Sequence, residues 1–323
     1  MGIILAILLF SAIIIIHELG HFLLAKANGI RVDEFSLGLG PTLFGKQFGE
    51  TKFSVKLLPF GGACMMGEDD VEDISEGSFN SKSVWARMSV IVAGPLFNLI
   101  LAWILCMIMI AWVGYRTPVV GGVIDGYSAQ EQGLSEGDVI TKIGGRSVHI
   151  WNDISLYNLT HSEEKEVEIT YKRDGKTHTA VLEPRQKEGD TAPLLGVTGG
   201  KMERPGFFGT LKYGAYTVKY WIDYTVDSLR MLVTGRVGMK DLSGPVGIVS
   251  AVDGVYQEAA PAGLSVIILN LMNIGILITA NLGAGCSYSD HRGGCRRISR
   301  DSVGGAPVMG VPFLVVGRQF QME

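Results

Sequence analysis

The sequence has few cysteines, and no two of them form a CxxC pair: they are Cys64, Cys106, Cys286 and Cys295. Disulfide frameworks are typical of small secreted domains, and a chain of 323 residues needs none. Charged residues are also scarce, at 19%, and the formal net charge is −4. This balance excludes the strongly basic surface that binds nucleic acid, so no nucleic-acid partner is expected.

The N-terminus lacks the basic residues with which a signal peptide begins, because the first lysine or arginine is Lys26. The apolar run before Lys26 is instead long enough to cross a bilayer. Hydrophobic residues make up 47% of the chain, and the mean hydropathy is +0.28. These features indicate a membrane protein in which residues 1–25 form a retained transmembrane helix.

Two further segments reach the length of a bilayer, residues 86–114 and residues 262–283. The first is apolar on every face, which is unusual for a helix in a soluble core. The second carries Asn270, Asn273 and Asn281, and polar groups at membrane depth usually face protein or water. The sequence therefore predicts an α-helical membrane protein with three clear spans, the last of which lines an interior.

Between the first two spans, residues 29–83 are predicted to form a membrane-associated β-hairpin region followed by an acidic polar loop. The stretch TKFSVKLL alternates polar and apolar residues, as a half-buried strand does. Open strand edges cannot face lipid, because their backbone groups would be left without hydrogen bonds. We therefore expect this sheet at the membrane interface, or against protein that lines a wet cavity.

Residues 117–186 are predicted to form a separate β-rich domain, because they contain short apolar runs bounded by glycine turns. The stretch SAQEQGLSEGDVITKIGG resembles a PDZ domain, a module that binds extended peptide segments by strand addition. Any other small β-rich module is the alternative. Residues 206–235 then form an amphipathic juxtamembrane helix, which either lies on the membrane surface or packs on the preceding domain.

The first predicted span contains three polar side chains, His17, Glu18 and His21, in the motif HELGH. Residues four apart project from one face of a helix, so the two imidazoles can bind one Zn²⁺ ion. Glu18 can then take a proton from a water that the metal activates. Each ionisable group at the bilayer centre costs roughly 2.5 to 3.5 kcal/mol, which a metal can offset. A purely structural polar cluster is the alternative.

Several motifs occur in the order found in the site-2 protease family, and the chain resembles the bacterial branch that carries a PDZ domain and acts in sigma-factor signalling. They are HELGH, EFSLGLGP, LLPFGG, AGPLFN, the PDZ-like insert and LSGPVGI. The resemblance implies a zinc-dependent intramembrane endopeptidase whose substrate is a single-span membrane protein such as an anti-sigma factor. It also implies a PDZ-like domain that filters access by substrates with bulky outer domains.

A substrate helix must be unwound before its peptide bonds can be attacked, because they are hidden in its own hydrogen-bond ladder. An edge strand can pair with an extended substrate and hold it. We therefore expect the strand from Phe53 to Leu58 to be an edge strand that binds the substrate, through Phe53, Val55, Leu57 and Leu58.

The resemblance ends near Gly283. The family implies a third zinc ligand, an aspartate in an LDG-type stretch after the third span, followed by a fourth span. The tail of residues 284–323 contains no such motif, and its apolar stretch VMGVPFLVVG is too short to cross a bilayer. Asp290 is the nearest acidic candidate for the third ligand, although it comes earlier than the family register, and His291 has suitable chemistry.

A frameshift is one interpretation of this atypical tail. Codons chosen for Ser287–Asp290 read Pro-Ile-Pro when they are shifted by one nucleotide, which resembles the family ending. A genuine divergent terminus is the alternative. In either case the sequence leaves open whether this particular chain is catalytically active.

Two other functions compete with proteolysis. One is a non-catalytic membrane protein whose PDZ-like domain captures peptides, and the other is a zinc transporter, which is disfavoured because only one helix offers clear ligands. Basic residues between the first two spans favour a cytoplasmic hairpin under the positive-inside rule. We therefore expect a multi-pass protein of the inner or plasma membrane, with the PDZ-like domain on the extracytoplasmic side.

Overall fold

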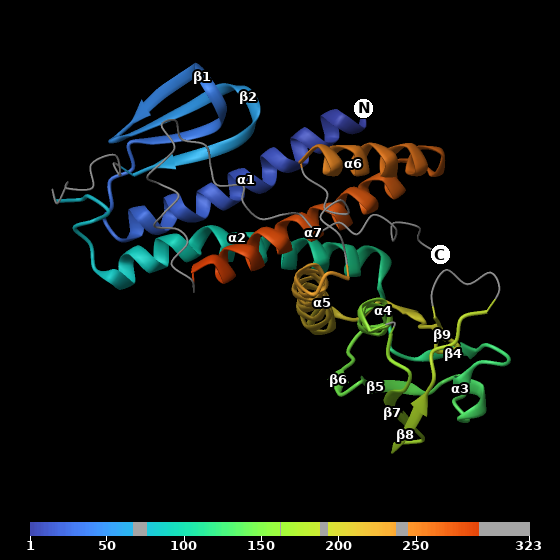
Figure 1. Ribbon diagram of the computed structural model, residues 1–323. Coiled ribbons are helices and arrows are strands. Elements are labelled where there is room, and N and C mark those ends of the chain that lie inside the picture. The colour runs from blue at the N-terminus through green and yellow to red at the C-terminus, as the bar shows by residue number, and fades with distance from the viewer. Residues whose placement is uncertain (67–75, 162, 188–192, 237–244, 291–323) are drawn as a thin grey trace. The chain divides into compact units, whose positions relative to one another are not determined.

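The computed structural model of the chain describes residues 1–66, 76–161, 163–187, 193–236 and 245–290 (Figure 1). These residues form two compact units. The first unit contains the residues up to Leu105 together with the C-terminal helices, and the second runs from Cys106 to Arg236. The expected fourth span and the segment after Asp290 lie outside the described residues.

In the described part of the chain, three helices are long and apolar enough to cross a membrane, and they coincide with the three apolar segments predicted to be spans. They are α1 (Gly2–Ala27), α2 (Val84–Val113) and α7 (Leu264–Asp290). A further helix, α6 (Pro245–Ala259), was not predicted, and the short 3-10 turn η2 (Ala260–Ala262) joins it to α7. The valines of α6 pack against α1 and α7 in one buried cluster. This cluster contains Ala6, Phe10, Ile13, Val252, Val255, Ile274 and Ile278.

Helices α1 and α2 meet at Gly20, the fourth residue of the HELGH motif. A Cβ on Gly20 would lie 2.6 Å from the backbone oxygen of Ala93, so only a hydrogen atom fits between the two helices. This close approach brings the face of α2 that carries Ala93 against the face of α1 that carries the motif. Packing of small residues is how apolar helices associate where lipid removes the usual hydrophobic driving force.

The predicted β-hairpin region forms a sheet of two long strands, β1 (Glu34–Phe48) and β2 (Thr51–Met65), which lies alongside α1 (Figure 1). Each residue from Glu34 to Leu37 has two partners, one within residues 52–55 and one within residues 62–65. Residues 42–48 pair in turn with residues 51–56. Each strand therefore contributes two segments, and β1 can bend between its two because Gly38 and Gly40 have φ of 86° and 90°.

This register shows that the prediction of an edge strand at Phe53–Leu58 is wrong for Phe53 and Val55. Phe53 pairs with both Phe35 and Lys46, and Val55 pairs with both Leu37 and Phe44, so neither residue offers a free backbone edge. In the described part of the chain the sheet contains only β1 and β2, so its outer segments are residues 42–48 and residues 62–65. Alternation of apolar residues predicts a strand, but it does not reveal how many partners the strand has.

The second unit is a β-rich module followed by a long helix. Its four-stranded sheet has the order β6-β5-β7-β8, and two smaller pairs join β4 with β9 and β3 with β10. The elements are β3 (Tyr115–Arg116), β4 (Val120–Val123), α3 (Ser128–Glu131), β5 (Val139–Ile143), β6 (Arg146–Ser147), α4 (Trp151–Thr160), β7 (Val167–Arg173), β8 (Lys176–Leu182), β9 (Val197–Gly199), β10 (Met202–Glu203) and α5 (Phe207–Val233).

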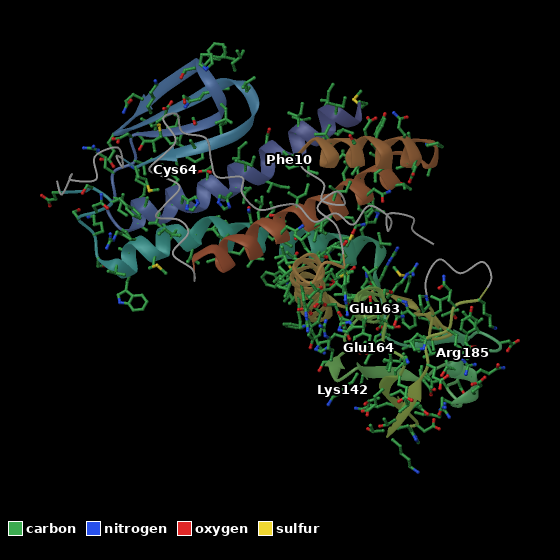
Figure 2. All side chains as sticks on the ribbon, in the orientation of Figure 1. Phe10, Cys64, Lys142, Glu163, Glu164 and Arg185 are labelled. Atoms are coloured by element: carbon green, nitrogen blue, oxygen red, sulfur yellow. The ribbon has the colours of Figure 1, made fainter. Side chains whose placement is uncertain are left out.

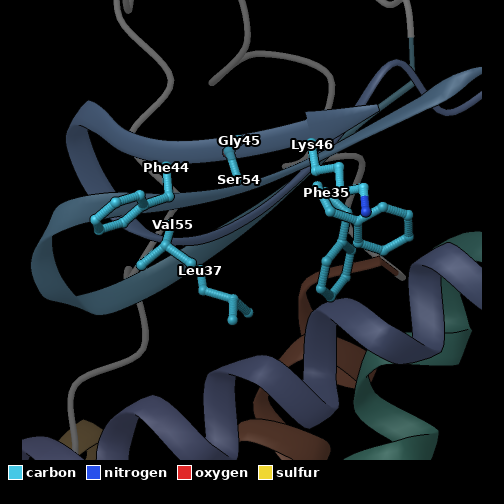
Figure 3. Close-up of a pocket in the computed structure, with 8 residues that line it drawn as sticks. Phe35, Leu37, Phe44, Gly45, Lys46, Ser54 and Val55 are labelled. Atoms are coloured by element: carbon cyan, nitrogen blue, oxygen red, sulfur yellow. The ribbon is translucent and has the colours of Figure 1, made fainter. Parts of the chain in front are cut away.

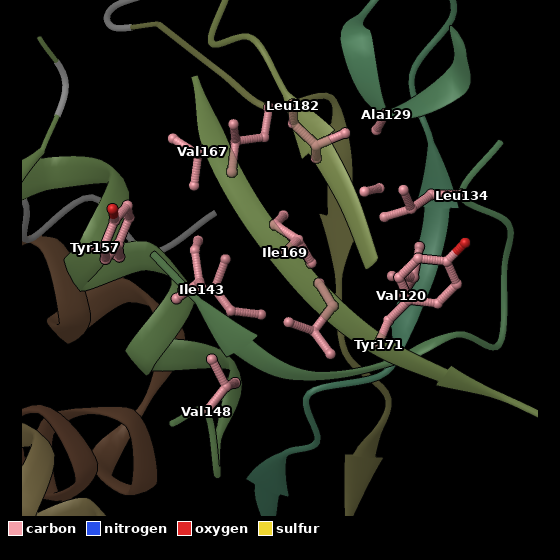
Figure 4. Close-up of a cluster of buried hydrophobic side chains, with 14 of the residues drawn as sticks. Val120, Ala129, Leu134, Ile143, Val148, Tyr157, Val167, Ile169, Tyr171 and Leu182 are labelled. Atoms are coloured by element: carbon pink, nitrogen blue, oxygen red, sulfur yellow. The ribbon is translucent and has the colours of Figure 1, made fainter. Parts of the chain in front are cut away.

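The module has its own hydrophobic core. Figure 4 shows Val120, Ile143, Ile169 and Leu182 pointing into one buried cluster between the strands. Charged residues such as Lys142 and Glu164 are exposed on its outside (Figure 2). The strands continue beyond the predicted boundary at residue 186, because β9 completes a pair with β4. Helix α4 was also not predicted, because its sequence WNDISLYNLT lacks a clear apolar stripe.

Helix α5 packs on the β-rich module, which favours the second of the two predicted placements for residues 206–235. The Arg146 guanidinium donates two hydrogen bonds, of 2.5 and 3.1 Å, to the carboxylate of Asp227 on α5. The rings of Tyr115 and Tyr213 stack with their centroids 3.9 Å apart. At its N-terminal end, however, α5 exposes the two adjacent rings of Phe207 and Phe208.

Candidate metal centre

The two histidines of the HELGH motif face each other on α1. Their Nε2 atoms are 3.2 Å apart, and the rings meet edge to face. Each Nδ1 atom points away from the pair and toward α2. The Nδ1 of His21 lies 2.7 Å from the backbone oxygen of Val90, and the Nδ1 of His17 lies 3.0 Å from the Nδ2 of Asn98. The two Nε2 atoms are therefore the pair that converges on one point.

The spacing of the two Nε2 atoms suits a shared zinc ion. Two nitrogens bound tetrahedrally at about 2.0–2.1 Å from zinc lie about 3.3–3.4 Å apart. A Cβ on Gly94 of α2 would lie 2.4 Å from the Nε2 of His21 and 2.6 Å from the Nε2 of His17. The glycine thus leaves empty the small space that both nitrogens face. His17 and His21 fit zinc in their donor chemistry, their spacing and the room in front of them.

Glu18 lies against strand β2 of the sheet. A Cβ on Gly62 of β2 would be 3.3 Å from the Cγ of Glu18, and the backbone of Cys64 hydrogen-bonds the Glu18 carboxylate. Glu18 follows His17 directly on α1, and its side chain lies beside an outer segment of the sheet. A proton acceptor here can serve both a water at the metal and a peptide on the sheet.

Two buried residues near the histidines were not assigned a role from the sequence. Asn98, on α2, is fully buried and contacts His17, and its backbone oxygen accepts a 3.1 Å hydrogen bond from the hydroxyl of Thr279 on α7. Thr279 is also fully buried. The motif AGPLFN contains both Gly94 and Asn98, so the signal was present, but its spacing does not reveal contact with α1.

The third protein ligand is not found in the part of the chain that the structure describes. Within that part, no group of three or more His, Cys, Asp and Glu side chains is placed to hold a metal ion. Asp290 is the last residue of α7, but its side chain is not among those described. His291 also lies outside the described residues. His17, Glu18 and His21 are thus brought together, whereas the candidate third ligand stays a prediction.

Two of the four predicted substrate-binding residues line a hollow on the face of the β-sheet. The hollow has a volume of about 300 Å³ and is drawn in Figure 3; its lining residues are Phe35, Leu37, Phe44, Gly45, Lys46, Phe53, Ser54 and Val55. Leu57 and Leu58 do not line it and are 53% and 41% exposed. Phe53 and Val55 therefore offer an apolar surface for side chains rather than a backbone edge.

These features define a class of protein: one with apolar helices long enough to cross a membrane and with the HExxH motif of metalloproteases on the first of them. A family profile described as peptidase family M50 matches residues 5–283. A protein of Clostridium acetobutylicum named a zinc metalloprotease is 37% identical over 282 residues, which are 87% of this chain and 80% of the relative. The chain belongs to peptidase family M50, the site-2 protease family, as its motifs indicated.

Two other similarities are more distant. The regulator of sigma-W protease RasP of Bacillus subtilis is 29% identical over 363 residues, covering 86% of this chain and 83% of that protein. A solved PDZ domain of an SdrC-like protein from Listeria monocytogenes is 26% identical and covers 26% of this chain and 88% of its own, with a TM-score of 0.23. The PDZ interpretation of the β-rich module stays a prediction.

Family membership supports the activity class and the metal. Peptidase family M50 consists of intramembrane proteases, and relatives such as the Clostridium acetobutylicum protein are named zinc metalloproteases. The match ends at Gly283, where the atypical tail begins. The comparisons therefore support a zinc metalloendopeptidase.

Proposed function

We propose that this chain cuts transmembrane segments of single-span membrane proteins, with His17 and His21 as zinc ligands and Glu18 as the general base. The observation that carries the proposal is the pair of Nε2 atoms, 3.2 Å apart, that face the space left by Gly94. When bound there, zinc supplies Lewis-acid activation of a water molecule near neutral pH. Each histidine directs its Nε2 atom toward that space, and its Nδ1 atom contacts α2.

Glu18 moves the proton in this mechanism. Its carboxylate accepts a proton from the attacking water as the water adds to the carbonyl carbon of the scissile bond. Glu18 then donates that proton to the leaving amine, so that one residue serves as base and then as acid. The hydrogen bond from the backbone of Cys64 holds the carboxylate toward β2, where an extended substrate would lie.

The outer segment Gly62–Met65 is the better candidate for pairing with the unwound substrate. It pairs with Glu34–Leu37 on one side, and Gly62 lies directly against Glu18. A substrate strand added to the other side would run past the proposed base, with its backbone held by main-chain hydrogen bonds. The hollow lined by Phe53 and Val55 lies on the other side of Glu34–Leu37 from this edge, so the predicted contact of these two residues with the substrate stays a separate prediction.

The helices and charges of the chain support a proposal for its location. Three apolar helices support a multi-pass protein of the inner or plasma membrane. The basic residues between α1 and α2 support a cytoplasmic sheet and an extracytoplasmic β-rich module. That module would filter access to the site or bind peptide segments of the substrate. Because one relative is named a regulator of sigma-W protease, anti-sigma factors are the proposed substrate class.

The test compares the parent protein with the Glu18→Gln variant on a model single-span substrate, with zinc content measured for both. Glutamine keeps the shape of the side chain but cannot accept the proton. We expect zinc to be retained and cleavage to fall by about 10²–10⁴-fold. Equal cleavage by both proteins would refute the role of Glu18, and a parent protein without zinc would refute the metal centre.

The second candidate function is a non-catalytic membrane protein that captures peptides with its β-rich module. It is favoured by one observation, namely that the described residues supply only two of the three ligands usual in catalytic zinc sites. Under this alternative the parent protein binds a peptide but does not cleave the model substrate. Cleavage that is lost in Glu18→Gln excludes it.

A further inference from the structure

We infer that Asn98 is a positioning residue that orients the His17 ring and keeps its Nε2 atom available for zinc. The inference rests on the zinc site proposed above. The Asn98 amide lies 3.0 Å from the Nδ1 of His17, and Asn98 is fully buried. The Oδ1 of Asn98 has no hydrogen-bond partner in the described part of the chain, which is costly for a buried polar atom.

The chemistry of a metal-binding imidazole explains why such a partner is needed. A neutral ring that binds zinc through Nε2 carries its proton on Nδ1, and an acceptor at Nδ1 fixes both the tautomer and the ring orientation. His21 has this arrangement already, because its Nδ1 lies 2.7 Å from the backbone oxygen of Val90. His17 has the same requirement, and its ring also contacts the backbone of Gly94.

The side-chain amide of Asn98 can meet this requirement without moving its backbone. The oxygen and nitrogen of an amide exchange places when the group turns by half a rotation. In that orientation Oδ1 accepts the Nδ1–H of His17, and the oxygen that lacked a partner gains one. An amide also provides the acceptor without adding a further negative charge at membrane depth, where a charge is costly.

Helix α7 holds the turn of α2 that carries Asn98. The hydroxyl of Thr279 donates a 3.1 Å hydrogen bond to the backbone oxygen of Asn98. One turn further along α7, a Cβ on Gly283 would lie 3.2 Å from the backbone oxygen of Pro95 and 2.7 Å from the Leu99 side chain. The helix that precedes the tail therefore packs tightly against the same turn of α2 that contacts His17.

The experiment measures zinc affinity in the full-length chain by competition with a chelator. Asn98→Leu removes the acceptor and approximately keeps the volume, and it should weaken zinc binding by about 10–100-fold. Asn98→Asp keeps an acceptor at the same place and should bind zinc within about threefold of the parent. Thr279→Val is the matched structural control, because it removes one buried hydrogen bond but leaves the Asn98 amide intact.

A second readout separates positioning from folding. The thermal midpoint of each metal-free variant is measured in excess chelator, where zinc cannot contribute to stability. Weaker zinc binding in Asn98→Leu, with rescue by Asn98→Asp and similar metal-free midpoints, supports the inference. Equal losses in Asn98→Leu and Asn98→Asp overturn it, as does parent-like affinity in Asn98→Leu. A parent protein that binds no zinc overturns the metal centre itself, and the role of Asn98 with it.

Discussion

Gly94 on α2 lies so close to His21 on α1 that a Cβ on the glycine would be 2.4 Å from the imidazole Nε2. The same Cβ would be 2.6 Å from the Nε2 of His17. No side chain other than hydrogen fits at this position while both nitrogens keep their places. The relationship explains why the second apolar helix needs a glycine at this point, although glycine weakens a helix.

Gly94→Ala should therefore eliminate zinc binding while the chain still folds. The added methyl group would occupy the space that both nitrogens face, and the crowding should cost about 1–3 kcal/mol of stability. Zinc content after purification and the thermal midpoint check the two effects. Gly254→Ala on α6 is the matched control, because nothing lies within 4 Å of a Cβ there. Parent-like zinc content in Gly94→Ala would contradict the placement of the metal.

The outer segment of β2 should contact the substrate, and the opposite outer segment should not. Single-cysteine variants at Met65 and at Phe48, made in Glu18→Gln with the four native cysteines replaced by serine, place one thiol on each edge of the sheet. A substrate with a cysteine beside its cleavage site should form a disulfide with Met65→Cys. Both positions are exposed, so accessibility alone does not favour one of them. Cross-linking at Phe48→Cys instead would assign the substrate to residues 42–48.

The ion pair between Arg146 and Asp227 should hold α5 on the β-rich module. The hydrogen bonds that Arg146 donates to the Asp227 carboxylate raise the pKa of Arg146, and the Asp227 side chain is only 8% exposed. Asp227→Asn should cost about 1.5–3 kcal/mol, because a buried charge-assisted hydrogen bond is lost. Hydrogen exchange of the α5 amides should accelerate. The surface pair of Arg185 and Glu131 is the control, and Glu131→Gln should leave α5 exchange unchanged.

The stability of the β-rich module should decrease in acid because of Asp138. Burial is the largest single effect and raises the pKa of this carboxyl, but the hydrogen bonds from Arg173 and from the backbone N–H of Ser135, together with the nearby positive charge of Arg173, outweigh it, so the pKa lies below its usual value. The ionised form is therefore favoured by folding. Its contribution is fully present above the unfolded pKa of about 3.9 and is lost as the pH falls through the lower folded pKa.

Hydrogen exchange of β5 and β7 in the full chain, followed from pH 6 to pH 2 and corrected for intrinsic rates, tests this dependence. In the parent, protection of these strands should fall most steeply below about pH 4. Asp138→Asn should show lower protection at neutral pH and a flatter acid profile, because the titrating group has been removed. An unchanged acid slope in Asp138→Asn would assign the transition to other carboxyl groups.

The tail after Gly283 should prove to be read in a shifted frame. Resequencing of the gene across the codons for Asn281 to Arg297 checks this directly, and one added or missing nucleotide is the expected result. Protein made from the restored frame should hold zinc more tightly, because an aspartate ligand would complete the site with His17 and His21. An unaltered gene would make the tail a genuine terminus and favour the non-catalytic alternative.

Much of the fold was predictable because its signals are local. The length of each apolar run predicted α1, α2 and α7, and alternation predicted strands in β2. The two histidines were predicted to share a face because residues four apart do so on any helix. Prediction failed for α6, because a short helix with valines on one side is ambiguous between helix and strand.

By itself, the sequence determined the spans, the HELGH motif and the family, since each depends on spacing within one segment or on the order of motifs. Only the tertiary structure decided which part of β2 lies at an edge, that Gly94 faces both Nε2 atoms, and that Asn98 contacts His17. Asn98 is 81 residues from His17 and 181 residues from Thr279, so no local pattern encodes these contacts. They arise because three apolar helices pack closely enough to exclude every side chain except those that fit.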